Sequence, residues 1–428
     1  MNIVMFTNTY LPHVGGVARS VEAFTTEYRK RGHRVLIVAP EFEDQPENEE
    51  DVVRVPAILN FNGSDFSVAL PPFGIIRERL NQFRPHIVHS HHPYLLGMTA
   101  VRVARFRELP VVFTHHTLYE QYIHYLPGDY TGMKQFVIEL ATRYANLTDQ
   151  VIAPSESIME LLRQRNVTLP ITVIPTGVQL ELYAQGNGAA FRKRYGIPRD
   201  AFVVGHLGRL AHEKNLGFLS DAVAEFLRRR ENAHFLVIGT GPAEQQMSAV
   251  MSAAGLSDRL HLAGLMENKQ ELADAYHAMN VFAFASRSET QGMVLSEAMA
   301  AAVPVVAVDA SGVREVVQDG DNGFMLEQED RVAFADRLAR IADLPPREYE
   351  RFKKGALRTA DEFSLSRSAD KALACYDRLC SQPFQPRTEE YRQWRRVMRL
   401  VKAEWEILEG LAAAANISLS DRSNPMKH

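Results

Sequence analysis

The chain has 428 residues, of which 46% are hydrophobic and 23% charged, and its formal net charge is −4. This length exceeds the size at which one domain usually stops growing, so we expect two domains. The weakly acidic balance argues against binding to nucleic acid, and no apolar run approaches the ~20 residues that span a bilayer. The first residues lack a basic leader, and the two cysteines, Cys375 and Cys380, lack metal-ligand spacing. These features predict a cytoplasmic protein with free thiols.

Short β-rich runs alternate with amphipathic helical segments, such as 17–31 and 94–107, through the first half of the chain. Such alternation predicts a parallel sheet that helices cover on both faces. The predicted strands of this sheet are 2–6, 34–38, 86–89, 111–114, 150–153 and 171–174.

A break at 174–178 and a polar stretch at 184–188 separate this half from a second one, in which the alternation restarts. We therefore expect two doubly wound α/β sheets with a ligand in the cleft at the carboxyl ends of their strands. After about residue 345 the strands stop and the chain is expected to be helical. The predicted strands of the second sheet are 202–207, 234–238, 260–263, 281–285 and 304–308. The expected parts are domains over 1–178 and 179–365, a helix over 366–382 that returns toward the first domain, and a helical tail over 383–428.

The segment 288–297 carries two glutamates, Glu289 and Glu297, eight residues apart on either side of Gly292. It follows a predicted strand, so Glu289 is expected in the loop at that strand's carboxyl end and Glu297 inside the next helix. Backbone N–H groups at a helix start favour a phosphate or sugar oxygen, and the carboxylates could bind hydroxyls on either side of it. The segment therefore predicts a site for a sugar nucleotide. A retaining glycosidase also uses two carboxylates, but these normally flank the scissile bond from separate strands.

Glycines and cations follow the first strand of each predicted sheet. Gly15 and Gly16 precede a predicted helix. They could form an ordinary turn, or they could allow the backbone to approach a ligand closely. Arg209 and Lys214 follow the first strand of the second sheet. Each cation alone would be a solvated surface charge, whereas together at the predicted cleft they could neutralise a diphosphate leaving group.

Histidines are frequent between residues 86 and 124, but their spacing does not match that of known zinc motifs. His116 is best placed to hydrogen-bond a polyol, because it follows the predicted strand 111–114. The others are interpreted as ordinary polar loop residues. The histidines of this region are His86, His89, His91, His92, His115, His116 and His124.

Basic and aromatic residues, including Trp394 and Trp405, are mixed in the segment 389–411. This mixture is typical of an interfacial membrane helix. The alternative is a C-terminal helix that packs on its own protein or on a partner.

Taken together, these residues resemble the GT-B retaining glycosyltransferases of family 4, and the resemblance extends from residue 1 to about 380. It rests on Gly15-Gly16, on Gly208-Arg209 with Lys214, and on the spacing of Glu289 and Glu297. The segments 175–178 and 239–242 match more weakly. The resemblance implies two Rossmann-like domains that face a central cleft, with the acceptor in the first and the nucleotide sugar in the second. It also implies transfer with retention of configuration and without a metal or other cofactor, in which the leaving phosphate helps to deprotonate the acceptor.

The resemblance also assigns roles to individual positions. Arg209 and Lys214 would bind the donor diphosphate, and Glu297 would bind the ribose hydroxyls. Glu289 and His116 are the expected catalytic residues, because they would meet the transferred sugar near the reacting centre. The other expected donor contacts are Gly15, Gly16, Met266, Gly292, Met293, Val294 and Leu295.

Segments 89–93 and 115–122 resemble the subgroup that glucosylates diacylglycerol at a bilayer surface. We therefore expect transfer of glucose from UDP-glucose to a hydroxyl of a membrane lipid, by a cytoplasmic protein in peripheral contact with the anionic inner face of the membrane. A soluble or polysaccharide acceptor is the nearest alternative. Other classes are a sugar-nucleotide epimerase, a phosphorylase and a non-catalytic sugar-nucleotide-binding protein. Epimerases of this scaffold lack the cation and glutamate arrangement, and no lysine stands out for a pyridoxal Schiff base.

Overall fold

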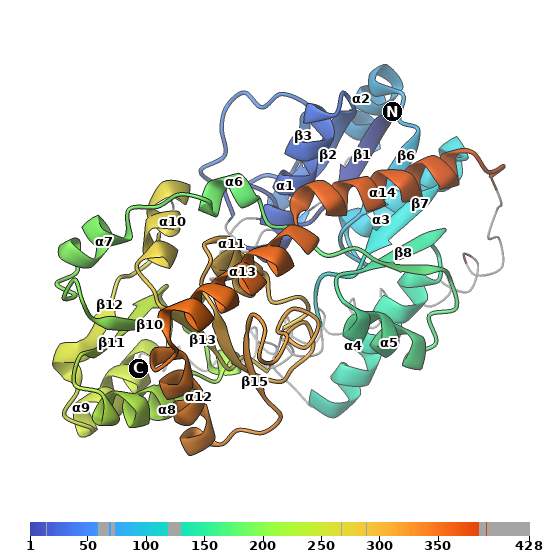
Figure 1. Cartoon of the computed structure of the whole chain (residues 1–428). Helices are drawn as coiled ribbons and strands as arrows, with labels where there is room; N and C mark the ends of the chain where they lie inside the picture. Colours follow the sequence, from blue (N-terminus) through green and yellow to red (C-terminus); the bar gives the residue numbers. More distant parts are fainter. Residues whose placement is uncertain are drawn as a thin grey trace, which may run out of the picture.

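Two parallel β-sheets, each covered by helices on both faces, form the computed structural model (Figure 1). Its architecture is therefore the α/β arrangement of two Rossmann-like domains that the alternation of strands and helices predicts. The residues that the structure describes are 1–13, 15–58, 68–69, 73–118, 130–266, 268–287, 289–384 and 391. The tail predicted over 383–428 lies outside this set, apart from residues 383, 384 and 391.

The first sheet has seven parallel strands in the order β3-β2-β1-β6-β7-β8-β9. Its central strands are continuous apolar runs because both of their faces are buried. The strands are β1 (Asn2–Phe6), β2 (Arg34–Pro40), β3 (Val52–Val55), β6 (Ile87–Ser90), β7 (Val111–Thr114), β8 (Gln150–Ala153) and β9 (Ile171–Val173). A separate antiparallel pair joins β4 (Ala57–Ile58) to β5 (Val68–Ala69).

Helices cover both faces of this sheet, and one of them comes from the end of the chain. Core residues of α1 and α14 pack on one face, and those of α2, α3, α4 and α5 pack on the other. The helices are α1 (Gly16–Lys30), α2 (Phe73–Phe83), α3 (Leu96–Arg107), α4 (Tyr130–Ala145), α5 (Glu156–Gln164) and α14 (Leu365–Cys380).

The second sheet has six parallel strands in the order β12-β11-β10-β13-β14-β15. Core residues of α6, α7, α10, α11 and α13 pack on one face, and those of α8, α9 and α12 pack on the other. The strands are β10 (Phe202–Leu207), β11 (Ala233–Ile238), β12 (Leu260–Leu262), β13 (Val281–Phe284), β14 (Val305–Val308) and β15 (Gly323–Leu326). The helices are α6 (Leu180–Tyr183), α7 (Gly188–Arg194), η4 (His212–Lys214), α8 (Leu216–Arg229), α9 (Glu244–Ala253), η5 (Ser257–Arg259), α10 (Lys269–His277), α11 (Met293–Ala300), α12 (Arg331–Ala342) and α13 (Pro346–Glu362).

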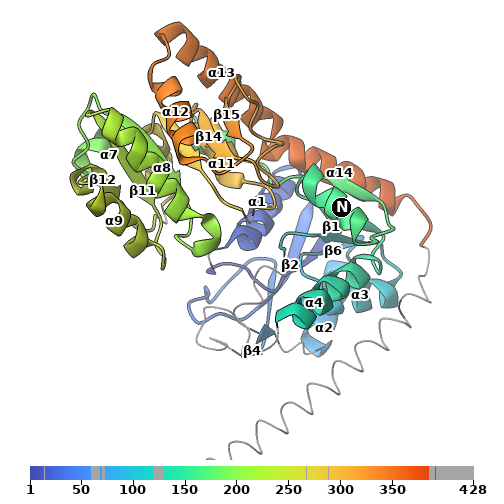
Figure 2. The same ribbon diagram turned by 90° about the horizontal axis from the view of Figure 1, so that it is seen from below.

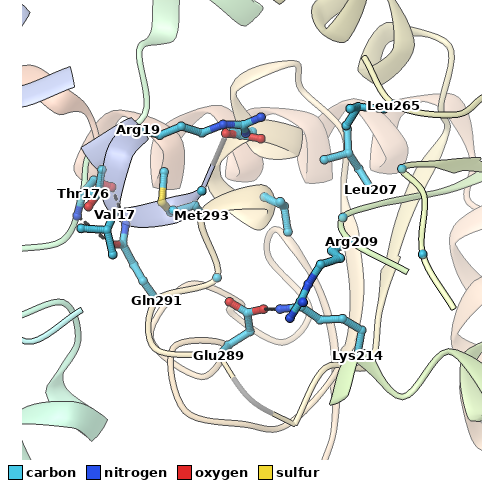
Figure 3. Close-up of a pocket in the computed structure, with 18 of the residues that line it drawn as sticks. Val17, Arg19, Thr176, Leu207, Arg209, Lys214, Leu265, Glu289, Gln291 and Met293 are labelled. Carbon is cyan, nitrogen blue, oxygen red and sulfur yellow. Dashed lines mark hydrogen bonds and ion pairs between the residues drawn. The ribbon is translucent and has the colours of Figure 1, made fainter. Parts of the chain in front are cut away.

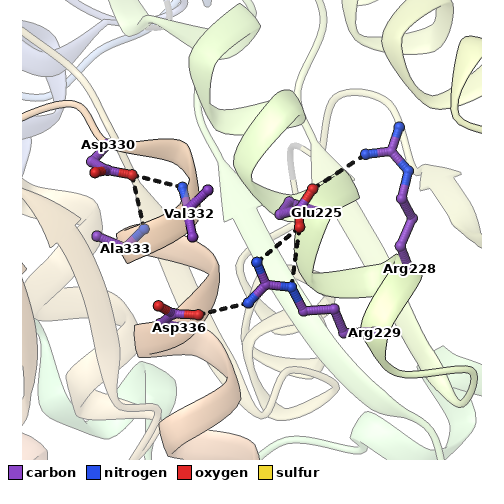
Figure 4. A network of polar contacts seen from close by, with 7 residues as sticks. All are labelled: Glu225, Arg228, Arg229, Asp330, Val332, Ala333 and Asp336. Atoms are coloured by element: carbon purple, nitrogen blue, oxygen red, sulfur yellow. Dashed lines mark hydrogen bonds and ion pairs between the residues drawn. The ribbon is translucent and has the colours of Figure 1, made fainter.

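Helices α8 and α12 are joined at the surface by a polar network (Figure 4). Arg229 on α8 contacts Glu225 of its own helix at 2.8 Å and Asp336 on α12 at 2.6 Å. Asp330 caps the start of α12, since its carboxylate accepts hydrogen bonds from two backbone N–H groups of the first turn. The apolar core beneath these helices includes Phe226 on α8 and Phe334 on α12, and the exposed ion pairs add a polar link at its rim.

The chain crosses between the two sheets twice, and the crossing segments lie side by side. Val178 pairs with Ser364, and the N–H of Leu365 donates to the carbonyl of Val178 at 2.8 Å. A Cβ atom on Gly177 would lie 2.1 Å from the Cα of Leu365, so only glycine allows this approach. Helix α14 then runs along the first domain (Figures 1 and 2). We propose boundaries at 178 and 365 for this reason.

Candidate functional site

A cleft of about 890 Å³ lies where the carboxyl ends of the two sheets face each other. Its walls come from the loop after β1, the segment after β7, the ends of β10 and β11, and the loop between β13 and α11. All but one of the site residues expected from the sequence line this cleft. The exception is Leu295, whose side chain is fully buried in the core and whose N–H donates to the carbonyl of Gly292.

The glycine pair contributes the wall on the first domain. Gly15 is the N-cap of α1 and Gly16 is the first helical residue. Among the described residues outside its own helix and its chain neighbours, no atom lies within 4 Å of the position that a Cβ on Gly16 would take, so the helix start is open toward the cleft. The unpaired N–H groups of such a first turn favour an anion or a hydroxyl oxygen.

The two expected cations stand on the opposite wall, and both have acidic partners. Arg209 follows β10 and pairs with Glu213, while Lys214 ends η4 and pairs with Glu289 (Figure 3). The Lys214–Glu289 pair is mostly buried, with side chains 21% and 16% exposed, whereas Arg209 is half exposed. From the sequence we expect Lys214 at the diphosphate and Glu289 at the transferred sugar. In the structure these two side chains form an ion pair.

Helix α11 begins at the cleft because Gly292 adopts a left-handed conformation, with φ at +69°. A Cβ there would lie 2.9 Å from the carbonyl oxygen of Gly312, so glycine is required on both counts. Met293 and Val294, the first helical residues, both line the cleft. The start of α11 thus presents backbone N–H groups to the space between the two domains.

Glu297 lies on α11 and is buried, and Tyr276 on α10 donates a hydrogen bond to its Oε2 at 2.8 Å. Burial raises the pKa of this carboxyl, and the hydrogen bond from Tyr276, the charge of Arg19 and a hydrogen bond from Tyr183 oppose the rise. Arg19 reaches the cleft from α1, so it belongs to the other domain (Figure 3). The carboxylate is therefore held by two tyrosines of its own domain, and the charge of Arg19 acts on it from the other domain.

Met266 follows β12 and is buried at the edge of the cleft, whereas the preceding Leu265 is 57% exposed there. The loop after β11 lies against the loop after β10. A Cβ on Gly239 would lie 1.9 Å from the carbonyl oxygen of Gly208, which explains a glycine at this position. Leu207, Ile238 and Leu272 line the cleft and belong to the same apolar cluster as Met266, so this end of the cleft is apolar.

His116 is half-buried and connects both walls. Its Nε2 lies 2.9 Å from Nδ1 of His91, and its carbonyl accepts a hydrogen bond of 3.1 Å from the hydroxyl of Thr290. Burial, followed by the charges of neighbouring histidines, lowers the pKa of His116 well below 6.5. The imidazole at the cleft is therefore neutral at pH 7.

The prediction that the other histidines are ordinary polar loop residues is wrong for four of them. His89 lies in strand β6, His91 and His92 follow that strand, and His115 follows β7. All four side chains lie in the core, where each is at most 5% exposed. His124 lies outside the described residues. In the part of the chain that the structure describes, no group of three or more potential ligand side chains is placed to hold a metal ion. The four buried histidines are His89, His91, His92 and His115.

Several cleft residues were missed by the sequence analysis because their partners are distant in the chain. Gln291 is the clearest example: its Oε1 accepts from the N–H of Thr176 at 2.7 Å, and its amide donates to the carbonyl of the same residue (Figure 3). Arg19 and Tyr276 also reach the site only through the fold. The only signal in the sequence was the position of Arg19 beside the glycine pair and of Gln291 between the two glutamates, and no such motif adjoins Tyr276.

Models of two known families match the chain. The model described as Glycosyltransferase Family 4 matches residues 14–182, and the model described as Glycosyl transferases group 1 matches residues 188–359. The first range covers the first domain from α1 onward, without β1, and the second range contains all strands of the second sheet.

Characterised relatives cover most of the chain. It is 30% identical to the alpha-monoglucosyldiacylglycerol synthase of Streptococcus pneumoniae over 348 residues, which are 80% of this chain and 79% of the relative. The enzyme of the same name from Acholeplasma laidlawii is 28% identical over 78% of this chain and 86% of its own length. A GDP-mannose-dependent alpha-mannosyltransferase of Mycobacterium tuberculosis is also 28% identical, over 76% of this chain and 84% of its own length.

Solved structures share the fold. The Anabaena protein Alr3699/HepE, crystallised with UDP and glucose, superposes with a TM-score of 0.69 at 19% identity, over 89% of this chain and 99% of that one. Sucrose-phosphate synthase of Thermosynechococcus elongatus superposes with a TM-score of 0.72 at 19% identity, over 88% of this chain and 98% of that one. The fold class and the cleft therefore define a GT-B glycosyltransferase. The chain belongs to the family that combines a family 4 domain with a group 1 glycosyltransferase domain.

Proposed function

We propose that the protein transfers glucose from UDP-glucose to a hydroxyl of a membrane lipid such as diacylglycerol, with retention of configuration and without a metal ion. The observation that carries this proposal is the composition of the cleft. Its cations Arg209 and Lys214, its helix start at Gly292 and its buried Glu297 lie on one wall, opposite the open start of α1.

The donor would lie along the wall of the second domain. Two cations and the N–H groups of α11 suit a diphosphate, because charge-assisted hydrogen bonds to phosphate are strong. The fixed carboxylate of Glu297 suits the hydroxyls of a ribose, and the apolar end near Met266 suits a nucleobase. A diphosphate would compete with Glu289 for Lys214 and leave Glu289 to accept hydrogen bonds from the transferred sugar.

The reaction needs no dedicated protein base in this proposal. The bond between the anomeric carbon and the diphosphate oxygen breaks, and the acceptor oxygen forms its bond to that carbon on the same face. The acceptor proton passes to the leaving phosphate oxygen. Arg209 and Lys214 stabilise the charge that develops on the diphosphate, and the neutral His116 holds a hydroxyl near the reacting carbon.

The lipid acceptor is supported by the names of two relatives, both alpha-monoglucosyldiacylglycerol synthases. A second candidate, mannosyl transfer from GDP-mannose, is favoured by the name of a third relative. Peripheral contact of a cytoplasmic protein with an anionic membrane is proposed from the sequence of the tail, 383–428. In the described part of the chain, no helix combines the length and the apolar character required to cross a bilayer.

The test is incubation with radiolabelled UDP-glucose or GDP-mannose, vesicles that contain diacylglycerol, and a panel of soluble acceptors, followed by extraction into organic solvent. We expect label from UDP-glucose in the organic phase. Label only on a soluble acceptor, or only from GDP-mannose, contradicts the proposed acceptor or donor. Binding of nucleotide sugar without any turnover would support a non-catalytic binding protein.

A further inference from the structure

A row of polar side chains runs from His116 at the cleft through the core of the first domain to α14. His116 contacts His91, whose ring lies over that of His89, with ring centres 4.1 Å apart. Nδ1 of His89 lies 2.6 Å from the hydroxyl of Tyr376 on α14, and the hydroxyl of Tyr28 on α1 lies 3.4 Å from the same oxygen. The row therefore connects the cleft with the last described helix of the chain.

His89 is held at both ring nitrogens. Its Nε2 lies 2.7 Å from the hydroxyl of Thr114, and its Nδ1 contacts Tyr376. Because a ring with partners at both nitrogens cannot rotate without losing hydrogen bonds in the protein interior, His89 is a rigid support. It also forms the surface on which the ring of His91 rests.

His91 is 1% exposed and stands between this support and the cleft. Its Nδ1 contacts His116, and the two rings are nearly parallel at 24°. Its Nε2 has no hydrogen-bond partner among the described residues. It borders a small cavity of about 10 Å³ that is also lined by Ser20 and Thr176, a space at the lower limit for one water molecule.

The hydrogen bond between the two histidines couples their protonation. Burial lowers the pKa of both rings well below 6.5, so each carries one N–H at pH 7. One proton lies between Nδ1 of His91 and Nε2 of His116. If His91 donates it, His116 presents an N–H at Nδ1; if His116 donates it, its Nδ1 is a bare acceptor. The state of His91 therefore determines what His116 offers to a ligand.

We infer that His91 is a positioning residue, which fixes the orientation of the His116 ring and selects the tautomer that faces the cleft, with His89 and Tyr376 holding His91 in place. The inference deepens the proposed function, since it rests on contact between His116 and the transferred sugar. It also gives α14 a part in the site, through Tyr376. A misplaced or wrongly protonated imidazole loses its hydrogen bond to the reacting sugar even though the donor still binds.

The first test is a double-mutant cycle with whichever donor and acceptor the enzyme turns over. We expect His91→Leu to lower kcat about 10- to 100-fold, with the donor KM changed less than about threefold. In a His116→Ala background, the same change should have little further effect, because His91 acts through His116. Equal losses of kcat with and without His116 would overturn the inference, since they indicate damage to the core alone.

A matched pair of conservative variants isolates the hydrogen bond. Asparagine places its amide near the position of Nδ1 and glutamine near that of Nε2, so His91→Asn should retain more activity than His91→Gln. Tyr376→Phe, which removes only the hydroxyl beside His89, should lower kcat by a smaller factor of about three to ten. His261→Asn, in the second domain, is the control for replacement of a partly buried histidine. If His91→Gln is more active than His91→Asn, the result would contradict a role for Nδ1 of His91.

The second test does not depend on turnover. Long-range ¹H–¹⁵N spectra of protein labelled at histidine report the tautomer of each neutral ring, and His116→Gln assigns the His116 signals. We expect one tautomer of His116 in the unmodified protein and a mixture in His91→Gln or His91→Leu, whichever folds, because neither side chain replaces Nδ1 of His91. An unchanged His116 spectrum in a folded variant would overturn the inference. Failure of the proposed glucosyl transfer alone would leave this result intact.

Discussion

Glu297 combines burial with a fixed geometry on the wall that the second domain contributes to the cleft. Tyr276 donates to it, and Arg19 opposes the pKa rise that burial causes. A carboxylate held in this way presents its remaining lone pairs in set directions. In the proposed function, these lone pairs accept hydrogen bonds from the two ribose hydroxyls.

Glu297→Gln should raise the donor KM about tenfold and change kcat less than about threefold. Glutamine keeps the size and the contact with Tyr276, but it loses the stronger, charge-assisted hydrogen bonds to the ribose. Steady-state kinetics with varied donor concentration measure both constants. Glu350→Gln on α13, outside the cleft, is the matched control. An unchanged donor KM would remove Glu297 from the ribose site.

Glu289→Gln should have the opposite pattern, with kcat lowered about 10- to 100-fold and the donor KM changed little. Its carboxylate pairs with Lys214 and, in the proposed function, passes to the hydroxyls of the transferred sugar. The same kinetic measurements separate the two glutamates. If Glu289→Gln raises only KM, the carboxylate contributes to donor binding and not to the reacting geometry.

At the scale of elements, the loop between β13 and α11 joins the two domains. Ser155 donates to the carbonyl of Thr290 at 2.7 Å, and Thr290 donates to the carbonyl of His116 at 3.1 Å. Gln291 pairs with both backbone groups of Thr176. The loop that carries Glu289 is therefore attached to the first domain on one side and to α11 on the other.

Gln291→Leu should loosen this loop. The change leaves the buried N–H and C=O of Thr176 unpaired, at a cost of roughly 1–3 kcal/mol for each group. We expect faster hydrogen–deuterium exchange in peptides that cover 286–293, together with a loss of about tenfold in kcat/KM. The exposed Gln328 provides the control substitution, Gln328→Leu. Unaltered exchange in these peptides would show that the amide does not hold the loop.

The sequence predicted most strands closely because buried parallel strands are continuous apolar runs. Strands β1, β7 and β10 begin and end at the expected residues. Strand β3 was missed because it is short and only every second side chain is buried, and β15 was missed because it begins with Gly323. That glycine is explained only by the fold, since a Cβ would lie 2.0 Å from the carbonyl oxygen of Val305.

The site was predictable only where its chemistry is local in the sequence. A glycine that begins a helix, with charged residues close to it in the chain, is recognisable within one short segment. Gly292, between Glu289 and Glu297, is an example. Pairs such as His91 with His116 or Gln291 with Thr176 join residues 25 and 115 positions apart, and no local pattern indicates them. Burial in and directly after strands β6 and β7 also changed the interpretation of four histidines from ordinary polar residues to core residues.

At the scale of the whole molecule, buried neutral histidines connect stability to pH. Burial lowers the pKa of His89 and His92 from 6.5 to about 3 and that of His206 to about 4. The unfolded chain binds protons at these groups below pH 6.5, whereas the folded chain does not. The free energy of unfolding therefore falls as the pH decreases through 6.5.

Urea unfolding between pH 7.5 and 5.5 should show this loss, on the order of 1 kcal/mol for each of the three histidines at pH 5.5. The raised pKa of Glu297 increases the free energy of unfolding as the pH falls, but Glu297 is a single group against several histidines. His92→Gln should reduce the slope of this pH dependence, because it removes one of the buried neutral histidines. A free energy of unfolding that stays constant over this range would contradict the burial of neutral histidines.

The central claim is that Arg209 and Lys214 hold the diphosphate of a sugar nucleotide in the cleft between the domains. Its most direct test is calorimetric titration of UDP-glucose, without acceptor, into the unmodified protein and into Arg209→Met/Lys214→Met, which keeps the apolar stems. Lys353→Met/Arg358→Met on α13 is the matched control. We predict a loss of affinity of about 100-fold or more in the cleft variant, since each hydrogen bond to a charged group contributes about 1.5–3 kcal/mol. Equal affinity of the cleft variant and the control would contradict the account.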